Sequence, residues 1–307
     1  MKTIRTSAPG NLMLLGEHAV LHGHRALVCA ANRRIHVALT PRADDQIQIR
    51  SALGCHTTTL DQLAPHGVFR FVMACITRQK DNLKTGFDLT IDSEFSHMVG
   101  LGSSAAVTVA MNAALNAWLN TPMDLRALFQ DSLAVIREIQ GLGSGADVAA
   151  SVYGGIVAYR AEPLEIEPLP ATHPLTVIYS GSKMPTVEVV RLVEARRKEQ
   201  PELYDGIFRL MDQSAGQAVE AIRRNDWKTF GDLLNLNQGL MEALGVSNAK
   251  LAEINWALRA EPGILGSKIS GSGLGDCVIG LGSSPRADWP YDVLPVEISA
   301  AGVDWNV

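Results

Sequence analysis

Residues 100 to 106 read Gly-Leu-Gly-Ser-Ser-Ala-Ala, and they lead directly into the apolar, helix-favouring stretch Val107 to Leu119. This order predicts a glycine-rich turn at the start of a helix. The unpaired N–H groups and the positive dipole end of such a helix attract phosphate oxygens, and glycines allow close approach to the backbone. No Walker-type Gly-Lys-Ser/Thr follows, so this is not the common P-loop. A tight turn with a serine cap is the alternative interpretation.

The same five residues recur at Gly280 to Ser284, which makes the context of the motif more informative than the motif itself. The second copy follows the strand-like run Cys277 to Leu281 and precedes Pro285, with no long apolar helix behind it. We therefore expect the second copy to be a surface loop. Only the first copy is a candidate phosphate site.

The composition is that of a folded protein with no nucleic-acid or membrane partner. The 307 residues are 47% hydrophobic and 19% charged, which is typical of globular chains and allows one large or two ordinary domains. The net charge of −5 favours neither nucleic acid nor anionic lipid. The four cysteines form no Cys-x-x-Cys pair, the first residues lack an apolar signal region, and no apolar run is long enough to span a bilayer. We expect a cytoplasmic protein.

The pattern of apolar residues predicts an α+β protein of two domains. Four prolines, Pro163, Pro168, Pro170 and Pro174, disfavour helix and indicate a linker, so the predicted domains are 1–170 and 171–307. Strands are expected at 25–31, 35–40, 46–50, 87–91, 155–159, 175–179, 264–269, 276–281 and 293–298. Helices are expected at 63–78, over most of 103–153, and from residues 187, 204, 227 and 249 onwards.

Two further segments of the first domain carry residue types suited to chemistry. Glu17 and His18 follow a glycine at the end of an apolar strand, where polar side chains can face a cleft; a solvated turn is the alternative. Asp147 follows a glycine turn at the start of a short helix. Its carboxylate can accept a proton from a substrate hydroxyl, or it can cap the helix.

Two segments of the second domain are also candidates. Gly271, Ser272 and Gly273 lie between two strand-like runs and form either a hairpin turn or a backbone cradle for phosphate. Asn235 to Leu240 places several amides inside a helical stretch, where burial without partners would be costly and exposure is the alternative. The histidines show no zinc-ligand spacing and the serines no Gly-x-Ser-x-Gly elbow, which argues against a zinc site and a hydrolase.

Together these segments resemble the GHMP kinases, the superfamily of galacto-, homoserine, mevalonate and phosphomevalonate kinases. Three motifs occur in the family's order: Ala8 to Gly23, Ser93 to Ala106 and Lys268 to Cys277. The resemblance implies a ribosomal-S5-like first domain, a ferredoxin-like second domain, and phosphoryl transfer from ATP to a small hydroxylated substrate.

The identity of that substrate follows from finer resemblances. Gly16 to Gly23 and Asn237 to Ser247 look like segments of mevalonate kinases, which implies transfer to the terminal hydroxyl of mevalonate. Gln140 to Gly155 and Gly275 to Cys277 are more similar to phosphomevalonate kinases, so phosphomevalonate is the alternative substrate. The resemblance is also compatible with a homodimer.

The resemblance implies roles for individual residues. Asp147 would be the catalytic base or would orient the hydroxyl, and Ser93 would contact the nucleotide. The ATP phosphates would be held by Gly100, Leu101, Gly102, Ser103, Ser104 and Ala105, with Ser104 also on Mg²⁺. The substrate side would be formed by Glu17, His18, Thr186, Gly271, Ser272 and Gly273.

Two positions depart from the family pattern. Asn11 stands in the catalytic site where mevalonate kinases carry a lysine that stabilises charge near the transferring phosphoryl group. The family's magnesium-binding glutamate precedes the aspartate by 11 residues, a position that is Ile136 here. Glu138 is the nearby carboxylate that could hold the metal with Ser104. These departures motivate a second hypothesis, a catalytically weak nucleotide- or metabolite-binding protein on the same scaffold.

Overall fold

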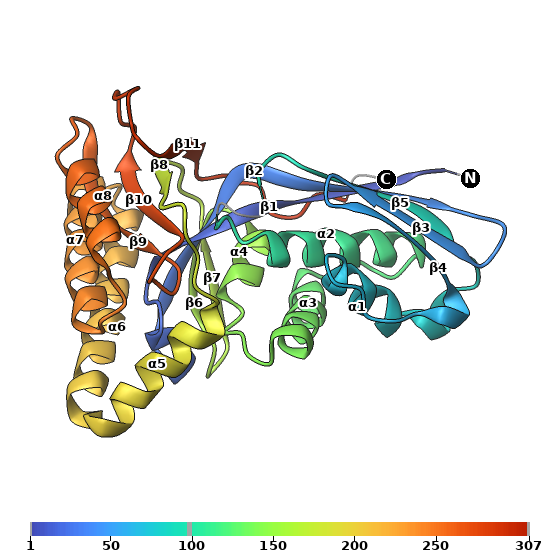
Figure 1. Ribbon diagram of the computed structural model, residues 1–307, viewed down its shortest axis with the longest axis horizontal. Coiled ribbons are helices and arrows are strands. Elements are labelled where there is room, and N and C mark those ends of the chain that lie inside the picture. The colour runs from blue at the N-terminus through green and yellow to red at the C-terminus, as the bar shows by residue number, and fades with distance from the viewer. Residues whose placement is uncertain (1, 97–99, 306–307) are drawn as a thin grey trace.

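The computed structural model describes residues 2–96 and 100–305 and consists of two sheets with their helices (Figure 1). The first sheet and its helices comprise β1 (Ile4–Leu15), β2 (Ala26–Pro41), β3 (Gln46–Ser51), β4 (Gly54–Thr59), α1 (Arg70–Arg78), β5 (Phe87–Ser93), α2 (Ser103–Trp118), α3 (Leu125–Gln140), α4 (Ala146–Tyr153), β6 (Ile156–Arg160) and β7 (Glu165–Leu169). The second comprises β8 (Pro174–Tyr179), α5 (Thr186–Glu199), α6 (Pro201–Arg223), α7 (Trp227–Ala243), α8 (Ala249–Arg259), β9 (Ile264–Ser270), β10 (Cys277–Gly282) and β11 (Asp292–Glu297). Short 3₁₀ helices are η1 (Ala19–His22), η2 (Leu60–Gln62) and η3 (Lys80–Asn82).

The two sheets have separate strand orders. The first runs β4-β3-β5-β2-β6-β7, with β1 also paired to β2, and the second runs β11-β8-β10-β9 with every pair antiparallel. Helices α1 to α4 lie on one face of the first sheet, and α5 to α8 lie at the other end of the elongated molecule (Figure 1). The predicted α+β class is confirmed.

Strand β2 unites two strands that were predicted separately. Its first six residues, Ala26–Ala31, are buried, and part of this half lies between β1 and β6. Its second half pairs with β1 and β5 and alternates between buried and more exposed residues, as expected of a sheet with one face toward water. One strand therefore extends from the middle of the molecule to the outer end of the first sheet (Figure 1).

Three other predictions need correction. Helix α1 begins only at Arg70, because Pro65 and Gly67 interrupt the expected helix. The proline-rich passage contains β7, where Pro168 is tolerated because β7 lies at the edge of the sheet. The second copy of the glycine motif is only partly a loop, since Gly280, Leu281 and Gly282 form the buried end of β10.

The second sheet joins both halves of the molecule. Along β10, Val278 packs against the core formed with α5 to α8, whereas Cys277, Ile279 and Leu281 pack into the core that continues from the first sheet. After β11 the chain returns to the first sheet, where Ile298 bridges Ala31 and Asp304 bridges Ser7. The segment after β11 and the shared core therefore connect the second sheet to β1 and β2 of the first sheet.

Candidate active site

The glycine turn predicted at residues 100–105 lies directly before α2. Gly100 and Gly102 have φ of 64° and 60°, and Gly102 is the residue before the first helical position. These positive φ values favour glycine. Leu101 is buried, and its carbonyl accepts a 3.0 Å hydrogen bond from the Asn11 amide N–H in β1. The turn is thus fixed by β1, while Ser103 and Ser104 at the start of α2 are half-buried. Residues 97–99 of this predicted motif lie outside the described residues.

Asn11 is buried and holds this turn in place. Its Nδ2 donates to Ser151 Oγ of α4 at 3.1 Å and to the Gly102 carbonyl at 3.4 Å. A Cβ at Gly102 would overlap the Asn11 amide, so the Asn11 side chain leaves room only for a glycine at position 102. Asn11 therefore links β1, α4 and the glycine turn, but it carries no charge.

Asp147 lies in the first turn of α4 with its side chain exposed to solvent. Gly145, not Asp147, is the residue before the helix, and no capping hydrogen bond from a side chain is present there. Protein atoms around the carboxylate raise its pKa to about 6 by desolvation, and Asp276 and Glu17 add to this effect while Lys183 opposes it. Such a pKa suits a base that works near neutral pH.

The turn between β9 and β10 brings the second domain to the same place. Gly271 and Gly273 both have φ of 89°, and a Cβ at Gly273 would overlap the Val246 carbonyl. The carbonyl of Ser272 accepts a 2.9 Å hydrogen bond from His18 Nε2. This contact identifies Nε2 as the protonated nitrogen, and burial lowers the pKa of His18.

Asp276, at the end of this turn, touches the glycine turn of the first domain. A Cβ at Gly100 would overlap the Asp276 carboxylate, so the two are in van der Waals contact. Lys183, in the loop between β8 and α5, forms an ion pair with Asp276 at 2.9 Å. The sequence reasoning missed both residues, because their meeting depends on the packing of two separate loops.

Glu17 is engaged in a buried ion pair. Its carboxylate accepts hydrogen bonds from Lys268 Nζ and, at 3.2 Å, from Asn237 Nδ2 of α7. Glu17 and Lys268 have side-chain exposures of 2% and 0%. Two of the amides predicted in α7, those of Asn237 and Gln238, are thus buried and hydrogen-bonded: Gln238 Oε1 accepts from the Ile269 N–H at 2.8 Å. Glu17 connects the end of β1 to the second domain. Its carboxylate is bonded to Lys268 and Asn237, although the sequence predicted that it would face the substrate.

Three predicted site residues lie on the periphery. Ser93 is exposed at the end of β5, where its Oγ bonds the Phe95 carbonyl at 2.7 Å. Thr186 is the exposed first residue of α5, three positions after Lys183. Glu138 is exposed on α3 and forms an ion pair with Arg78 at 3.4 Å.

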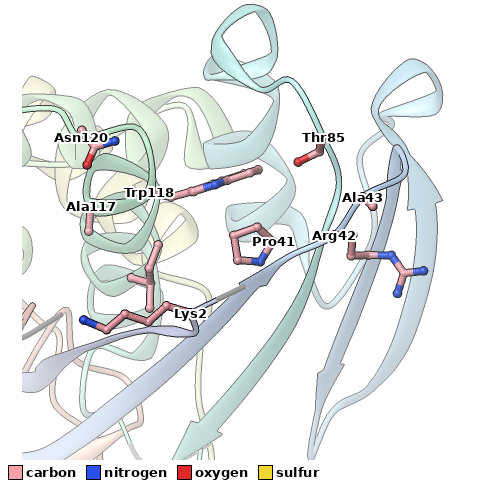
Figure 2. A pocket seen from close by; sticks show the side chains of 9 residues that line it. Lys2, Pro41, Arg42, Ala43, Thr85, Ala117, Trp118 and Asn120 are labelled. Atoms are coloured by element: carbon pink, nitrogen blue, oxygen red, sulfur yellow. The ribbon is translucent and has the colours of Figure 1, made fainter.

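Two open hollows differ in their relation to these residues. The first, of about 490 Å³, lies at the outer end of the first sheet beside Trp118 and Pro41 (Figure 2), and the residues that line it contain no carboxylate and no glycine. The second, of about 500 Å³, includes His22, Gly143 and Ser144, and so lies beside the loop that leads to Asp147. The second hollow is the one associated with the predicted chemistry.

Within the described residues, no group of three or more His, Cys, Asp or Glu side chains is placed to hold a metal ion by itself. No helix among these residues is long and apolar enough to cross a membrane.

Comparison with known proteins defines the class. Residues 68–155 match the GHMP kinases N terminal domain, and residues 218–288 match the GHMP kinases C terminal family. The chain belongs to the GHMP kinases, and it is an ATP-dependent kinase that acts on a hydroxyl group.

The more specific relatives are mevalonate kinases. The mevalonate kinase of Archaeoglobus fulgidus is 36% identical over 92% of this chain and 94% of its own, and that of Thermococcus gammatolerans is 31% identical over 93% and 91%. The crystal structure of Methanococcus jannaschii mevalonate kinase superposes with a TM-score of 0.82 at 23% identity, covering 97% of this chain and 98% of that one. Lactococcus lactis galactokinase shares the fold with a TM-score of 0.85 at 18% identity, covering 99% and 95%.

Proposed function

We propose that this chain transfers the γ-phosphoryl group of ATP to the terminal hydroxyl of mevalonate. The observation that carries the proposal is the meeting of three segments: the glycine turn before α2, Asp147 at the start of α4, and the turn between β9 and β10 with Asp276. The names of the relatives at 31% and 36% identity support mevalonate as the acceptor.

The glycine turn and Asp147 have complementary tasks in this reaction. N–H groups at the start of α2, with the Ser103 and Ser104 hydroxyls, bind the phosphates of ATP. Asp147 orients the acceptor hydroxyl and takes its proton, because a carboxylate with a pKa of about 6 is largely ionised at pH 7. The turn at Gly271 to Gly273 closes the site from the second domain.

Magnesium fits the oxygen-rich surroundings of the glycine turn. Mg²⁺ usually takes one or two protein oxygens when phosphates and water supply the rest, and the half-buried Ser104 hydroxyl is suitably placed at the start of α2. The bound ion would neutralise phosphate charge. Ile136 packs against Gly143 and offers no ligand, so Glu138 is proposed as the carboxylate, which requires it to leave Arg78. If Glu138 is a ligand, E138Q raises the Mg²⁺ concentration needed for half-maximal turnover; an unchanged requirement removes Glu138 from the site.

An ADP-release assay tests the function with four acceptors: mevalonate, phosphomevalonate, homoserine and galactose. We expect turnover with mevalonate above the other three. Preference for phosphomevalonate would reassign the substrate within the same family. Silence with all four, together with tight ATP binding by calorimetry, would favour the second candidate, a nucleotide-binding protein of weak activity, which the uncharged Asn11 motivates.

Two further properties stay predictions: a cytoplasmic location, which the composition suggests, and pairing into a homodimer, with which the family resemblance is compatible. Cell fractionation checks the first, and size-exclusion chromatography with light scattering checks the second.

A further inference from the structure

The candidate site is rich in negative charge even without ATP. The carboxylates of Glu17 and Asp276 both act on Asp147 through their charge. Lys268 neutralises Glu17 in the buried core, whereas Asn11, which contacts the glycine turn of the first domain from β1, is neutral. Transfer of a phosphoryl group requires positive charge near the equatorial and leaving oxygens.

Lys183 is the lysine that pairs with Asp276, one of the two carboxylates that act on Asp147. Its Nζ lies 2.9 Å from Asp276 Oδ2, and the same Asp276 carboxylate contacts Gly100 in the glycine turn. Among the groups that act on Asp147, Lys183 is the cation, and its effect exceeds that of either carboxylate. The lysine charge is therefore close to both the glycine turn and Asp147.

The backbone around Lys183 is fixed by hydrogen bonds, while its side chain is paired with Asp276 at a partly exposed position. The Asp276 N–H donates to the Ser182 carbonyl at 2.7 Å, and the Ser180 N–H donates to the Asp276 carbonyl at 2.9 Å. A Cβ at Gly275 would come within 2.8 Å of the Ser182 carbonyl, so the two loops lie in backbone contact. The Lys183 side chain is 42% exposed. It can consequently move from Asp276 to a phosphate oxygen without rearrangement of the loop.

We propose that Lys183 is a catalytic residue, which supplies from the second domain the positive charge that Asn11 does not supply from the first. This inference rests on the proposed kinase reaction. The acceptor oxygen forms a bond to the γ-phosphorus, the bond from that phosphorus to the bridging oxygen breaks, and its electron pair leaves with ADP. The hydroxyl proton passes to Asp147, and Lys183 keeps its protons throughout. Asp276 is a positioning residue that holds Lys183 before ATP arrives.

The test compares K183M with K250M in the purified full-length protein. Lys250 is a matched control, because its Nζ lies 3.6 Å from the place of a Cβ on Gly181 in the same loop, but it faces the Tyr291 ring. We expect K183M to lower kcat about 100-fold, with the Kd for ATP and the KM for the acceptor changed by less than about threefold. K250M should retain wild-type kcat, and thermal melting should show both variants folded.

Two further readouts separate a catalytic from a structural role. In K183M the acidic limb of the kcat–pH profile should move to higher pH, because Asp147 loses its neighbouring cation while Asp276 and Glu17 remain. In D276N the limb should move to lower pH.

The outcomes are distinguishable from those for the proposed function. A wild type without turnover on any acceptor refutes the proposed function and the role of Lys183 with it. A wild type that turns over, with K183M within about threefold of it, refutes the role of Lys183 alone. An equal loss in K250M also refutes it, because general loop charge would then be the cause.

Discussion

The buried pair Glu17–Lys268 allows a prediction whose size follows from the structure. Replacing Lys268 by methionine keeps most of the side-chain volume. It leaves the Glu17 carboxylate, which is 2% exposed, with Asn237 as its hydrogen-bond partner among the described side chains. Removing one partner of a buried ion pair costs about 3–5 kcal/mol, because the other charge stays in a poorly solvated place. At roughly 2–4 °C per kcal/mol for a chain of this size class, the melting temperature should fall by roughly 6–20 °C.

The assay is thermal unfolding of the wild type, E17Q, K268M and the double variant E17Q/K268M. We expect the double variant to lose less stability than the two single losses added together, by at least about 2 kcal/mol, because neither charge is left unpaired. The exposed pair Lys228–Asp232 provides a control, and K228M should change stability by less than about 0.5 kcal/mol. Additive losses at Glu17 and Lys268 would refute the reasoning, since they would mean that the two groups do not interact in the folded protein.

Three predictions concern the reaction. D147N should lower kcat by about 10²–10⁴-fold with the melting temperature unchanged, because the carboxylate is exposed and takes part in chemistry more than in packing; near-normal turnover would remove Asp147 from the role of base. The kcat of the wild type should rise with pH through about 6, since Asp147 with a raised pKa must lose its proton to act as a base; a profile flat between about pH 5 and 8 would contradict this. G102A should weaken ATP binding at least about tenfold in calorimetry, because alanine is strained at φ 60° and its Cβ overlaps Asn11; G239A, a helical glycine with nothing within 4 Å of an added Cβ, is the control and should bind ATP like the wild type.

Local sequence patterns predicted most of the elements. The long apolar run after residue 102 became α2, and the three closing strands became β9, β10 and β11 with ends displaced by at most one residue. These elements have strong periodicity and clear breakers, which are local properties. The failures include the joining of two predicted strands into β2. There β1 pairs with β2 on both sides of the polar interruption at Asn32 to Arg34, with a shift of register between Pro9 and Asn11.

The site was predicted less completely, for a physical reason. Residues such as Gly102 and Asp147 can be predicted from their neighbours in the sequence, since a glycine turn before a helix is a local pattern. Lys183 and Asp276 are 93 positions apart, and Lys268 and Glu17 are 251 apart. The first pair forms because β8 and β10 are neighbours in the second sheet, and the second pair forms because the end of β1 packs against the second domain. Single-sequence reasoning could point to a charged residue, but it could not identify its partner.

The distribution of charge across the two domains explains why Asp147 differs from its acidic neighbours. The second domain contributes both lysines: Lys268 is committed to Glu17, and Lys183 is in contact with Asp276. No described residue gives Asp147 a hydrogen bond or an ion pair. It is therefore the carboxylate whose pKa is raised, to about 6, while it stays accessible. A base needs this combination, because a carboxylate stabilised by its own lysine would hold a proton too weakly to accept one from a hydroxyl. Glu17 and Asp276, which are paired with lysines, thus have structural roles, while Asp147, which is not paired with a described residue, is left to act as the base.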